Sequence, residues 1–159
     1  MVVVVAEQHK EDMTMAAEFT YNPVQTVLQN QPVILNTTIG CSKGYVIHRN
    51  ESGLVTLRGI VNNPCASFAR YQVTFNGNIA VPTGGTVGPI SLAIAIDGEP
   101  VLTSNAIVTP AAVDQYFNVT STAIVTVPKG CCFNVSVENT SGETSINVQN
   151  ANLVVDRIA

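Results

Sequence analysis

The chain has 159 residues, a length that suits one domain with a hydrophobic core of its own. Hydrophobic residues make up 46% of the sequence and charged residues only 11%, against roughly 25% in an ordinary soluble domain. The net charge is −4 and the seven basic residues are scattered singly, so we expect no nucleic-acid partner.

The place of the missing charge is taken by strand-forming Val, Ile and Thr, and by turn-forming Asn, Ser, Gly and Pro. A surface poor in Lys and Glu is typical of an extracellular or particle-bound domain, or of one covered by copies of itself. No stretch of about 20 apolar residues is present, so we expect no membrane partner. The apolar run 2–6 is too short for a signal peptide, so we expect a protein that stays in the cytoplasm, assembles there or leaves by lysis.

Residues 1–17 differ in composition from the rest of the chain. They hold a polar and charged stretch at 7–12, and Met13 and Met15 fit alternative start positions. We interpret this segment as either a flexible N-terminal tail or a docking arm. The remainder, 18–159, is then a single domain.

Short strands separated by turns are expected in the first part of that domain. Two β-prone runs in 19–35 are punctuated by Asn-Pro and Gln-Pro, and Pro confines such runs to sheet edges or strand starts. Two more strands are expected at 41–49 and 53–61, joined by a turn at 50–53.

The longest strand is expected between Ala66 and Val81. From position 71 to 76 apolar and polar residues alternate, which predicts a strand with one buried face. The buried face would hold Tyr71, Val73 and Phe75, and the opposite face Gln72, Thr74 and Asn76. Asn76-Gly77 suits either a hairpin turn or a bulge in a continuing strand.

A glycine-containing loop follows at 82–89. No helix comes after it, so its glycines do not indicate a phosphate site. We expect this loop to be a contact surface, through Thr83, Gly84, Gly85 and Thr86.

The next segment, Ile90–Ile96, carries large residues on one side and Ala on the other, which predicts a strand covered on both faces. Asp97-Gly98 is a strong hairpin signal. The returning strand is expected at 101–108, and the segment 111–116 is the one candidate for a short helical turn.

Three further strand segments complete the chain, at 116–127, 131–139 and 146–158, with a turn at 128–130. In the last segment the alternation changes phase, which predicts a bulge or turn near Asn150. Eight to ten short strands without a convincing helix predict an all-β protein, an antiparallel two-sheet sandwich or jelly roll.

No catalytic arrangement stands out in the sequence. His48 and Arg49 lie beside Glu51 and Ser52, but adjacent residues on a turn do not form a triad. We therefore expect a protein without enzymatic activity and without a cofactor.

The four cysteines give two interpretations. Cys41 and Cys65 form a disulfide, or they are buried thiols. Cys131 and Cys132 are adjacent and lack the spacing of a zinc site, so we expect no metal.

From Phe68 onward the order of strands and turns resembles the jelly roll shared by tumour necrosis factor and the complement globular head, and most of all its bacterial and phage versions. The matching pieces are ARYQVTFNGNIAV, the L-x-I-x-I-D-G pattern at 92–98, NVTSTAIVTV, the turn at 128–130, CFNVSVEN and ANLVVDRI. The chain departs from the family in lacking a collagen-like stalk and in its paired cysteines.

This resemblance implies a trimer in which one sheet packs around a threefold axis. The strands from Tyr71, Cys131 and Asn152 would supply that sheet. Its axis-facing residues would be Gln72, Thr74, Asn134, Ser136, Asn152 and Val154.

Two functions compete on this evidence. The first is a structural domain of a phage particle, a trimeric head decoration or fibre tip at the virion surface, with a capsid or other virion protein as partner. The second is an extracellular binding module, in a bacterial extracellular or spore-surface setting, that recognises carbohydrate or a cell-surface receptor through its loops.

Overall fold

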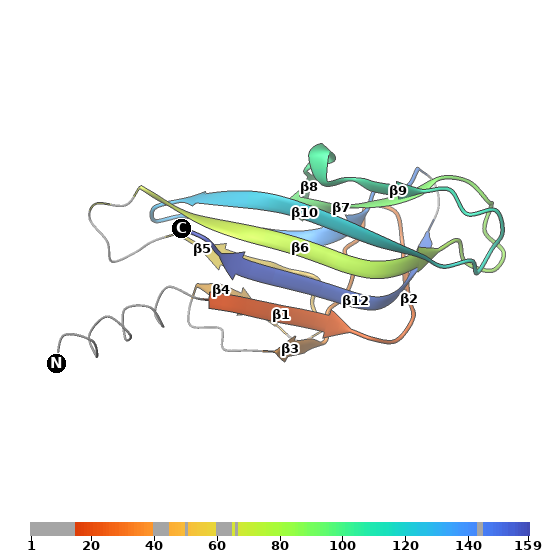
Figure 1. Ribbon diagram of the computed structural model, residues 1–159, viewed down its shortest axis with the longest axis horizontal. Coiled ribbons are helices and arrows are strands. Elements are labelled where there is room, and N and C mark those ends of the chain that lie inside the picture. Colours follow the sequence, from red (N-terminus) through yellow and green to blue (C-terminus); the bar gives the residue numbers. More distant parts are fainter. Residues whose placement is uncertain (1–14, 40–44, 50, 60–64, 66, 143–144) are drawn as a thin grey trace.

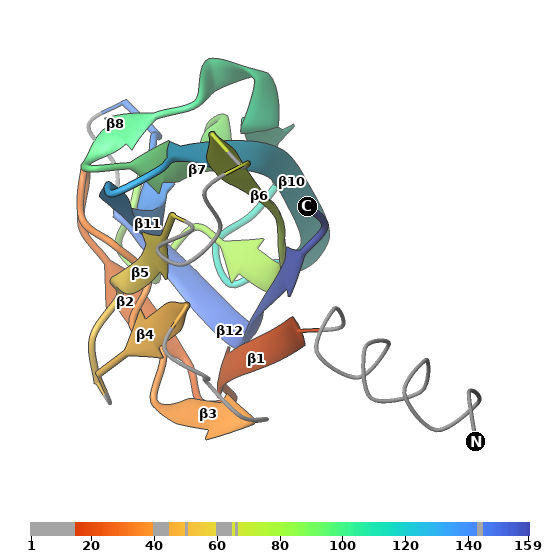
Figure 2. The same ribbon diagram turned by 90° about the vertical axis from the view of Figure 1, so that its left-hand side faces the viewer.

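The computed structural model describes residues 15–39, 45–49, 51–59, 65, 67–142 and 145–159, and in them the chain forms a sandwich of two antiparallel sheets (Figure 1). The end-on view in Figure 2 places β5 and β11 of one sheet on one side and β10 of the other sheet opposite. The all-β sandwich predicted from the sequence is therefore confirmed.

The first sheet, sheet A, runs in the order β10-β6-β12-β1-β3, and β2 also pairs with β12. Its strands are β1 (Met15–Tyr21), β2 (Gln25–Val27), β3 (Thr37–Ile39), β6 (Phe68–Ala80), β10 (Phe117–Pro128) and β12 (Ile146–Arg157). The three longest strands lie side by side, because β6 pairs with β10 from Phe68 to Ile79 and with β12 on its other edge.

The second sheet, sheet B, runs in the order β4-β5-β11-β7-β8, and β9 also pairs with β7. Its strands are β4 (Val46–His48), β5 (Val55–Arg58), β7 (Ile90–Ile96), β8 (Glu99–Pro100), β9 (Ala106–Val108) and β11 (Cys132–Asn139). A single turn of 3₁₀ helix, η1 (Leu102–Ser104), lies between β8 and β9.

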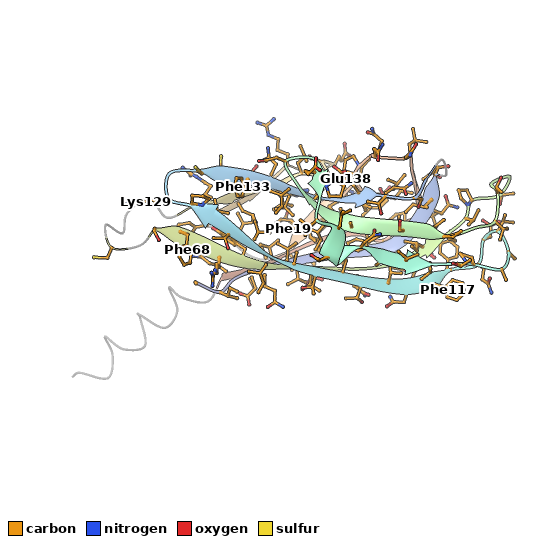
Figure 3. All side chains as sticks on the ribbon, turned by 90° about the horizontal axis from the view of Figure 1, so that it is seen from above. Phe19, Phe68, Phe117, Lys129, Phe133 and Glu138 are labelled. Atoms are coloured by element: carbon orange, nitrogen blue, oxygen red, sulfur yellow. The ribbon has the colours of Figure 1, made fainter. Side chains whose placement is uncertain are left out.

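The core lies between the sheets and follows the alternation of the sequence. Along β6 the residues Tyr71, Val73 and Phe75 are fully buried, as predicted, and Figure 3 shows Phe19 of β1 in the interior. The Tyr71 hydroxyl donates a hydrogen bond of 2.5 Å to the backbone carbonyl of Arg58 in β5, which links the two sheets. Burial raises the pKa of Tyr71, so the hydroxyl stays a donor.

Strand β7 is covered on both faces, as predicted from its alternation of large residues with Ala. Its residues from Ile90 to Ala95 are all buried. Ala93 and Ala95 lie opposite Glu138 and Ser136 of β11, and these two polar residues are buried as well.

Two backbone features predicted from the sequence are confirmed. Asp97 and Gly98 both have positive φ, of 51° and 82°, and they form the tight turn between β7 and β8. In β12 the register against β6 shifts between Gln149 and Asn152, and Asn150 in that shift has a φ of 58°. The irregularity opposite Asn76 and Gly77 therefore lies in β12, while β6 continues without a turn.

Other expectations are wrong in their detail. The segment 111–116 contains no helix, and the only helical turn in the described part of the chain is η1. The returning strand expected at 101–108 is replaced by η1 and the short β9, because the Ser104 hydroxyl donates to the Val101 carbonyl and accepts from the Ile94 backbone N–H. Strand β1 begins at Met15, three residues before the domain start expected at 18.

The largest correction concerns β11. The sequence interpretation placed the strand from Cys131 in the same sheet as those of Tyr71 and Asn152. In the structure β11 pairs with β5 and β7 and belongs to sheet B. The turn at 128–130 joins β10 of sheet A to β11 of sheet B, so this connection crosses from one sheet to the other.

Candidate assembly face

The outward face of sheet A is formed by alternate residues of its long strands, whose neighbours point into the core. These residues are mostly Asn, Thr and Gln, together with a few apolar side chains. We call them the assembly face: Glu18, Ile39, Gln72, Thr74, Asn76, Asn78, Asn118, Thr120, Thr122, Ile124, Asn147, Asn150, Asn152, Val154 and Asp156.

The register of the strands aligns these residues in rows across the sheet. One row runs from Thr122 through Thr74 and Val154 to Glu18 and Ile39. Five strands thus contribute to one continuous surface, because every step along the row is a cross-strand pair.

Hydrogen bonds join many of these side chains to one another. The hydroxyls of Thr74 and Thr122 lie 3.2 Å apart, and Asn118 donates to Asn78 at 3.1 Å. Further bonds run from Thr120 to Asn76 at 3.2 Å, from Asn78 to Asn150 at 3.0 Å and from Asn150 to Asn22 at 2.6 Å. Much of the polar capacity of this face is therefore satisfied within the face itself.

Charged groups are few on this side of sheet A, and they include Arg70 of β6, which is exposed and alternates in phase with Gln72. The Glu18 carboxylate accepts a hydrogen bond from the Asn152 amide, and Asp156 lies opposite Gln72 near one end of β12. Beside Glu18 the face has a mainly apolar hollow of about 240 Å³, lined by Ala16, Ala17, Glu18, Ile39 and Val154. Ile39 is 51% exposed, so this hollow presents apolar surface to the outside.

The predicted axis-facing residues are divided by this geometry. Gln72, Thr74, Asn152 and Val154 lie together on the assembly face. Asn134 and Ser136 do not, because β11 is in sheet B, on the opposite side of the sandwich. The alternation of apolar and polar residues shows which side of a strand faces the core. It does not show which sheet contains the strand, because both sheets face the same core.

The residues that β10 and β1 add to the face were not proposed from the sequence. Thr120, Thr122 and Ile124 alternate with the buried Val119, Ser121 and Val125. This period-two pattern shows which residues of β10 point away from the core. Together with the pairing of β10 with β6, it would have placed them on the assembly face.

The predicted contact loop lies at the end of the sandwich where β6 ends and β10 begins. Thr83, Gly84 and Thr86 are exposed there, and Gly85 is half-buried, with its N–H bonded to the Pro82 carbonyl at 2.9 Å. The Thr83 hydroxyl donates to the Asp114 carboxylate, which ties this loop to the loop before β10. Figure 3 shows Phe117 at this end of the molecule.

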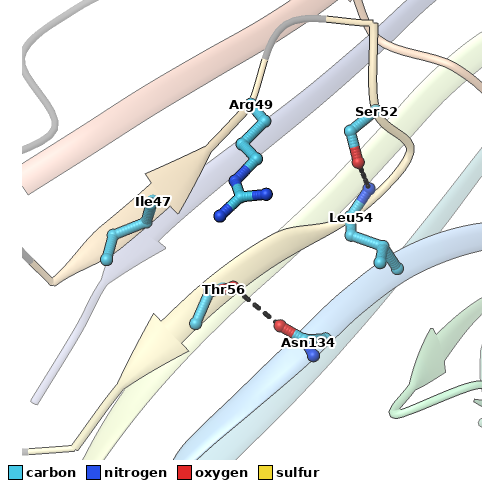
Figure 4. Close-up of a pocket in the computed structure, with 6 residues that line it drawn as sticks. All are labelled: Ile47, Arg49, Ser52, Leu54, Thr56 and Asn134. Carbon is cyan, nitrogen blue, oxygen red and sulfur yellow. Dashed lines mark hydrogen bonds between the residues drawn. The ribbon is translucent and has the colours of Figure 1, made fainter.

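A second hollow, of about 420 Å³, lies on the outward side of sheet B (Figure 4). It is lined by Ile47, Arg49, Ser52, Leu54, Thr56 and Asn134. Asn134, which was expected at a trimer axis, thus lies in a hollow beside the His48–Ser52 segment that the sequence marked for its polar residues.

Glu138 of β11 is the buried acid of sheet B, with 8% of its surface exposed. Burial raises the pKa of its carboxyl, the nearby Ser136 hydroxyl lowers it, and the charge of Glu99 raises it further. Asn139, next in β11, is fully buried and its amide donates to the Val27 carbonyl at 3.0 Å.

The cysteine and metal expectations have different outcomes. Cys41 lies outside the described residues, so the Cys41–Cys65 disulfide stays a prediction. Cys65 is exposed, so the alternative of a buried thiol is wrong at this position. Cys131 and Cys132 are exposed thiols as well. Within the described ranges no three His, Cys, Asp or Glu residues are grouped to hold a metal ion. In the same ranges no helix is long and apolar enough to cross a membrane.

No family model matches this sequence, and no curated protein matches it. Solved structures do match its fold. The globular domain of zebrafish complement 1qA is 16% identical with a TM-score of 0.59, covering 90% of this chain and 94% of that one. The Eiger TNF of S. frugiperda is 14% identical with a TM-score of 0.66, covering 92% and 93%.

Murine APRIL is a third match, at 9% identity and a TM-score of 0.60, covering 91% of this chain and 99% of that one. The chain therefore has the jelly-roll fold of the tumour necrosis factor and complement globular-head domains. Identities this low establish the fold alone.

Proposed function

We propose that the protein is a non-enzymatic, self-associating jelly-roll domain, a homotrimer that serves as a structural part of a phage virion. The observation that carries this proposal is the assembly face of sheet A. It is broad, it is nearly uncharged, and its side chains are already bonded to one another.

Self-association through such a face is favoured by its low desolvation cost. Burying an isolated charge is expensive, whereas burying an amide or hydroxyl that keeps its hydrogen bond is not. Asn76, Asn78 and Thr74 all keep a partner within the same face when a second copy covers them. The cost of forming the interface is therefore low for the centre of the sheet.

The apolar hollow beside Glu18 supplies a favourable contribution. Ile39 and Val154 line it, and each buried CH₂ group contributes about 0.8 kcal/mol. A side chain from a second copy that fills this hollow would both gain apolar contact and fix the relative position of the two chains.

The absence of enzymatic activity is part of the proposal and is supported by the state of His48. Its Nδ1 lies 3.1 Å from the Thr38 hydroxyl, and its Nε2 lies 2.9 Å from the Ser52 carbonyl oxygen. One ring nitrogen is thus engaged by a threonine hydroxyl and the other by a backbone carbonyl, so neither partner is the Ser or Cys side chain that a hydrolase of this type would use.

The finer part of the proposal is a head-decoration or fibre domain at the virion surface, with a capsid or other virion protein as partner. Light scattering of the intact protein at micromolar concentration tests the assembly, and co-sedimentation with particles tests the location. A trimer that co-sediments with particles is the expected result. A monomer that never co-sediments would overturn both parts.

A second candidate function is an extracellular binding module that recognises carbohydrate or a cell-surface receptor through its loops. The observation that favours it is the group of exposed apolar side chains near the contact loop, namely Val87, Val113 and Phe117, which are 45%, 36% and 38% exposed. Specific binding on a glycan or receptor array that is lost on changing Phe117→Ser would favour this function over the virion one.

A further inference from the structure

The hollow on the outward side of sheet B has the size and lining of a ligand site, and it is separate from the assembly face. Its volume of about 420 Å³ falls in the range of small-molecule sites. Three structural elements form it, since Ile47 comes from β4, Thr56 from β5 and Asn134 from β11. It lies on the sheet opposite the assembly face, so it stays open when that face is covered.

The floor of the hollow is fixed by a short hydrogen bond. The Thr56 hydroxyl donates to the Asn134 side-chain oxygen at 2.6 Å (Figure 4). The Asn134 backbone is held as well, because its N–H donates to the Asp97 carboxylate at 2.9 Å and its carbonyl accepts from the Asp97 N–H at 2.7 Å. With its oxygen engaged by Thr56, the Asn134 side-chain amide keeps its two N–H donors for another partner.

Arg49 adds a positive charge from the rim. Figure 4 shows its guanidinium reaching from the end of β4 over the hollow, between Ile47 and Leu54. The Arg49 carbonyl accepts from the Ser52 N–H at 3.1 Å, but among the residues that the structure describes none forms an ion pair or a hydrogen bond with the Arg49 guanidinium. The Ser52 hydroxyl oxygen accepts from the Leu54 N–H at 3.1 Å, so its proton remains available to a ligand.

Arg49, Asn134 and Ser52 all line the hollow and supply N–H and O–H donors to it. Such a set recognises an acceptor-rich anion, and a guanidinium fits a carboxylate with two parallel hydrogen bonds. Ile47 and Leu54, which are 43% and 45% exposed, add apolar walls. A sugar ring that carries one carboxylate has groups for both parts of the hollow. Its carboxylate and hydroxyls accept hydrogen bonds from the donors, and its C–H faces pack against the apolar walls.

We propose that this hollow binds a monosaccharide that carries a carboxylate, a sugar acid, with the carboxylate on Arg49 and ring hydroxyls on Asn134 and Ser52. Two acidic groups lie nearby, Glu51 on the exposed turn and Asp97 behind the Asn134 backbone. Glu51 is exposed, so water and salt screen its charge, and the Asp97 carboxylate is engaged by the Asn134 backbone N–H.

The test is a titration of the intact protein with D-glucuronate, followed by NMR through the backbone amide resonance of Leu54, which lines the hollow and is kept in every variant. We expect a saturable shift with glucuronate and no comparable shift with D-glucose, acetate or N-acetyl-L-glutamate. Arg49→Gln should weaken the affinity at least about tenfold, as the loss of a charge-assisted hydrogen bond implies. Asn134→Asp, which keeps the acceptor for Thr56 but replaces the donors with a negative charge, should remove binding.

Arg70→Gln is the matched control, because Arg70 is an equally exposed arginine of sheet A, stacked at 4.8 Å on the Phe68 ring. It should leave the affinity for glucuronate unchanged. No saturable shift with glucuronate would overturn the proposal, and so would an equal loss in Arg49→Gln and Arg70→Gln. Equal affinity for N-acetyl-L-glutamate would overturn the sugar and indicate an acidic peptide. Light scattering on the same samples reports the assembly independently.

Discussion

The two outward faces of the sandwich are built by the same alternation but differ in what they offer. The face of sheet A is a set of amides and hydroxyls that bond to one another, such as Thr74 with Thr122 and Asn118 with Asn78. The face of sheet B is hollowed between β4, β5 and β11, and the lining of that hollow includes the N–H donors of Arg49 and Asn134.

This difference teaches that exposure alone does not indicate what a polar surface does. A face whose hydrogen bonds are satisfied internally loses little when a large flat partner covers it. A hollow with convergent unused donors gains most from a small ligand rich in acceptors. We therefore assign the large partner to sheet A and the small ligand to sheet B.

A charge placed at the centre of the assembly face should give the largest effect. Thr74→Arg puts a guanidinium in the row between Thr122 and Val154, where a second copy would bury it unpaired. We expect the loss of about 3–5 kcal/mol of association free energy and conversion of the oligomer to a monomer, measured by light scattering.

The matched control is Thr56→Arg, which adds the same charge at an outward threonine of sheet B. Its mass in solution should equal that of the wild type. If Thr56→Arg dissociates the oligomer and Thr74→Arg does not, the two faces have been assigned the wrong way round.

Loss of the hydrogen bond from Tyr71 that links the two sheets should give the next largest effect, a decrease in the stability of the fold. Tyr71→Phe removes the hydroxyl that bonds to the Arg58 carbonyl and leaves that part-buried acceptor without this donor. We expect a loss of about 1–3 kcal/mol in the free energy of unfolding, measured by urea denaturation. Tyr116→Phe, at a half-buried position outside both sheets, should change it by less than about 0.5 kcal/mol. A similar loss in both variants would contradict a special role for Tyr71.

The turn that holds the floor of the sheet B hollow is expected to be sensitive to a β-carbon. Gly98 has a φ of 82°, a conformation that costs an L-residue about 1–2 kcal/mol. Gly98→Ala should lower the midpoint of thermal unfolding accordingly. Gly88→Ala is the control, because an added β-carbon there meets no atom within 4 Å and the φ is not positive, so its midpoint should stay near that of the wild type.

The smallest expected effect concerns Glu138. Because burial raises the pKa of this carboxyl in the folded state, the folded chain holds its proton at pH values where the unfolded chain has lost it. The favourable contribution is complete below the unfolded pKa and is lost as the pH rises through the raised folded pKa. Glu138→Gln should therefore be more stable than the wild type near neutral pH, and the difference should shrink in acid.

Urea denaturation at a series of pH values measures this difference. Ser136→Ala removes the hydroxyl that favours the ionised form, so the stability of that variant should fall more steeply with rising pH. A difference between Glu138→Gln and wild type that does not vary with pH would show that Glu138 keeps its ordinary titration in the folded chain.

Most of the strands were predictable because their information is local. The alternation at 71–76 predicted the buried face of β6, the Ala positions of β7 predicted its double coverage, and the change of phase near Asn150 predicted the irregularity in β12. Each of these signals depends on neighbours a few positions apart, which a sequence displays directly.

The placement of β11 and the sheet B hollow was not predictable in the same way. Phe133, Val135 and Val137 face the core from whichever sheet contains them, so alternation cannot choose the sheet. The hollow joins Arg49 to Asn134 across 85 positions of sequence, through the pairing of β5 with β11. Such a site depends on the pairing of strands that lie far apart in the sequence, and this pairing cannot be deduced from composition or residue spacing.

The position of β12 has a consequence for the order of folding. It comes last among the described strands, yet it lies in the middle of sheet A, between β6 and β1, with Met15 opposite Arg157. Until β12 arrives, β6 and β1 each present an open edge with unpaired backbone groups. Sheet closure is therefore a late step that joins distant parts of the chain, and we expect refolding in the millisecond-to-second range that is typical of such topologies.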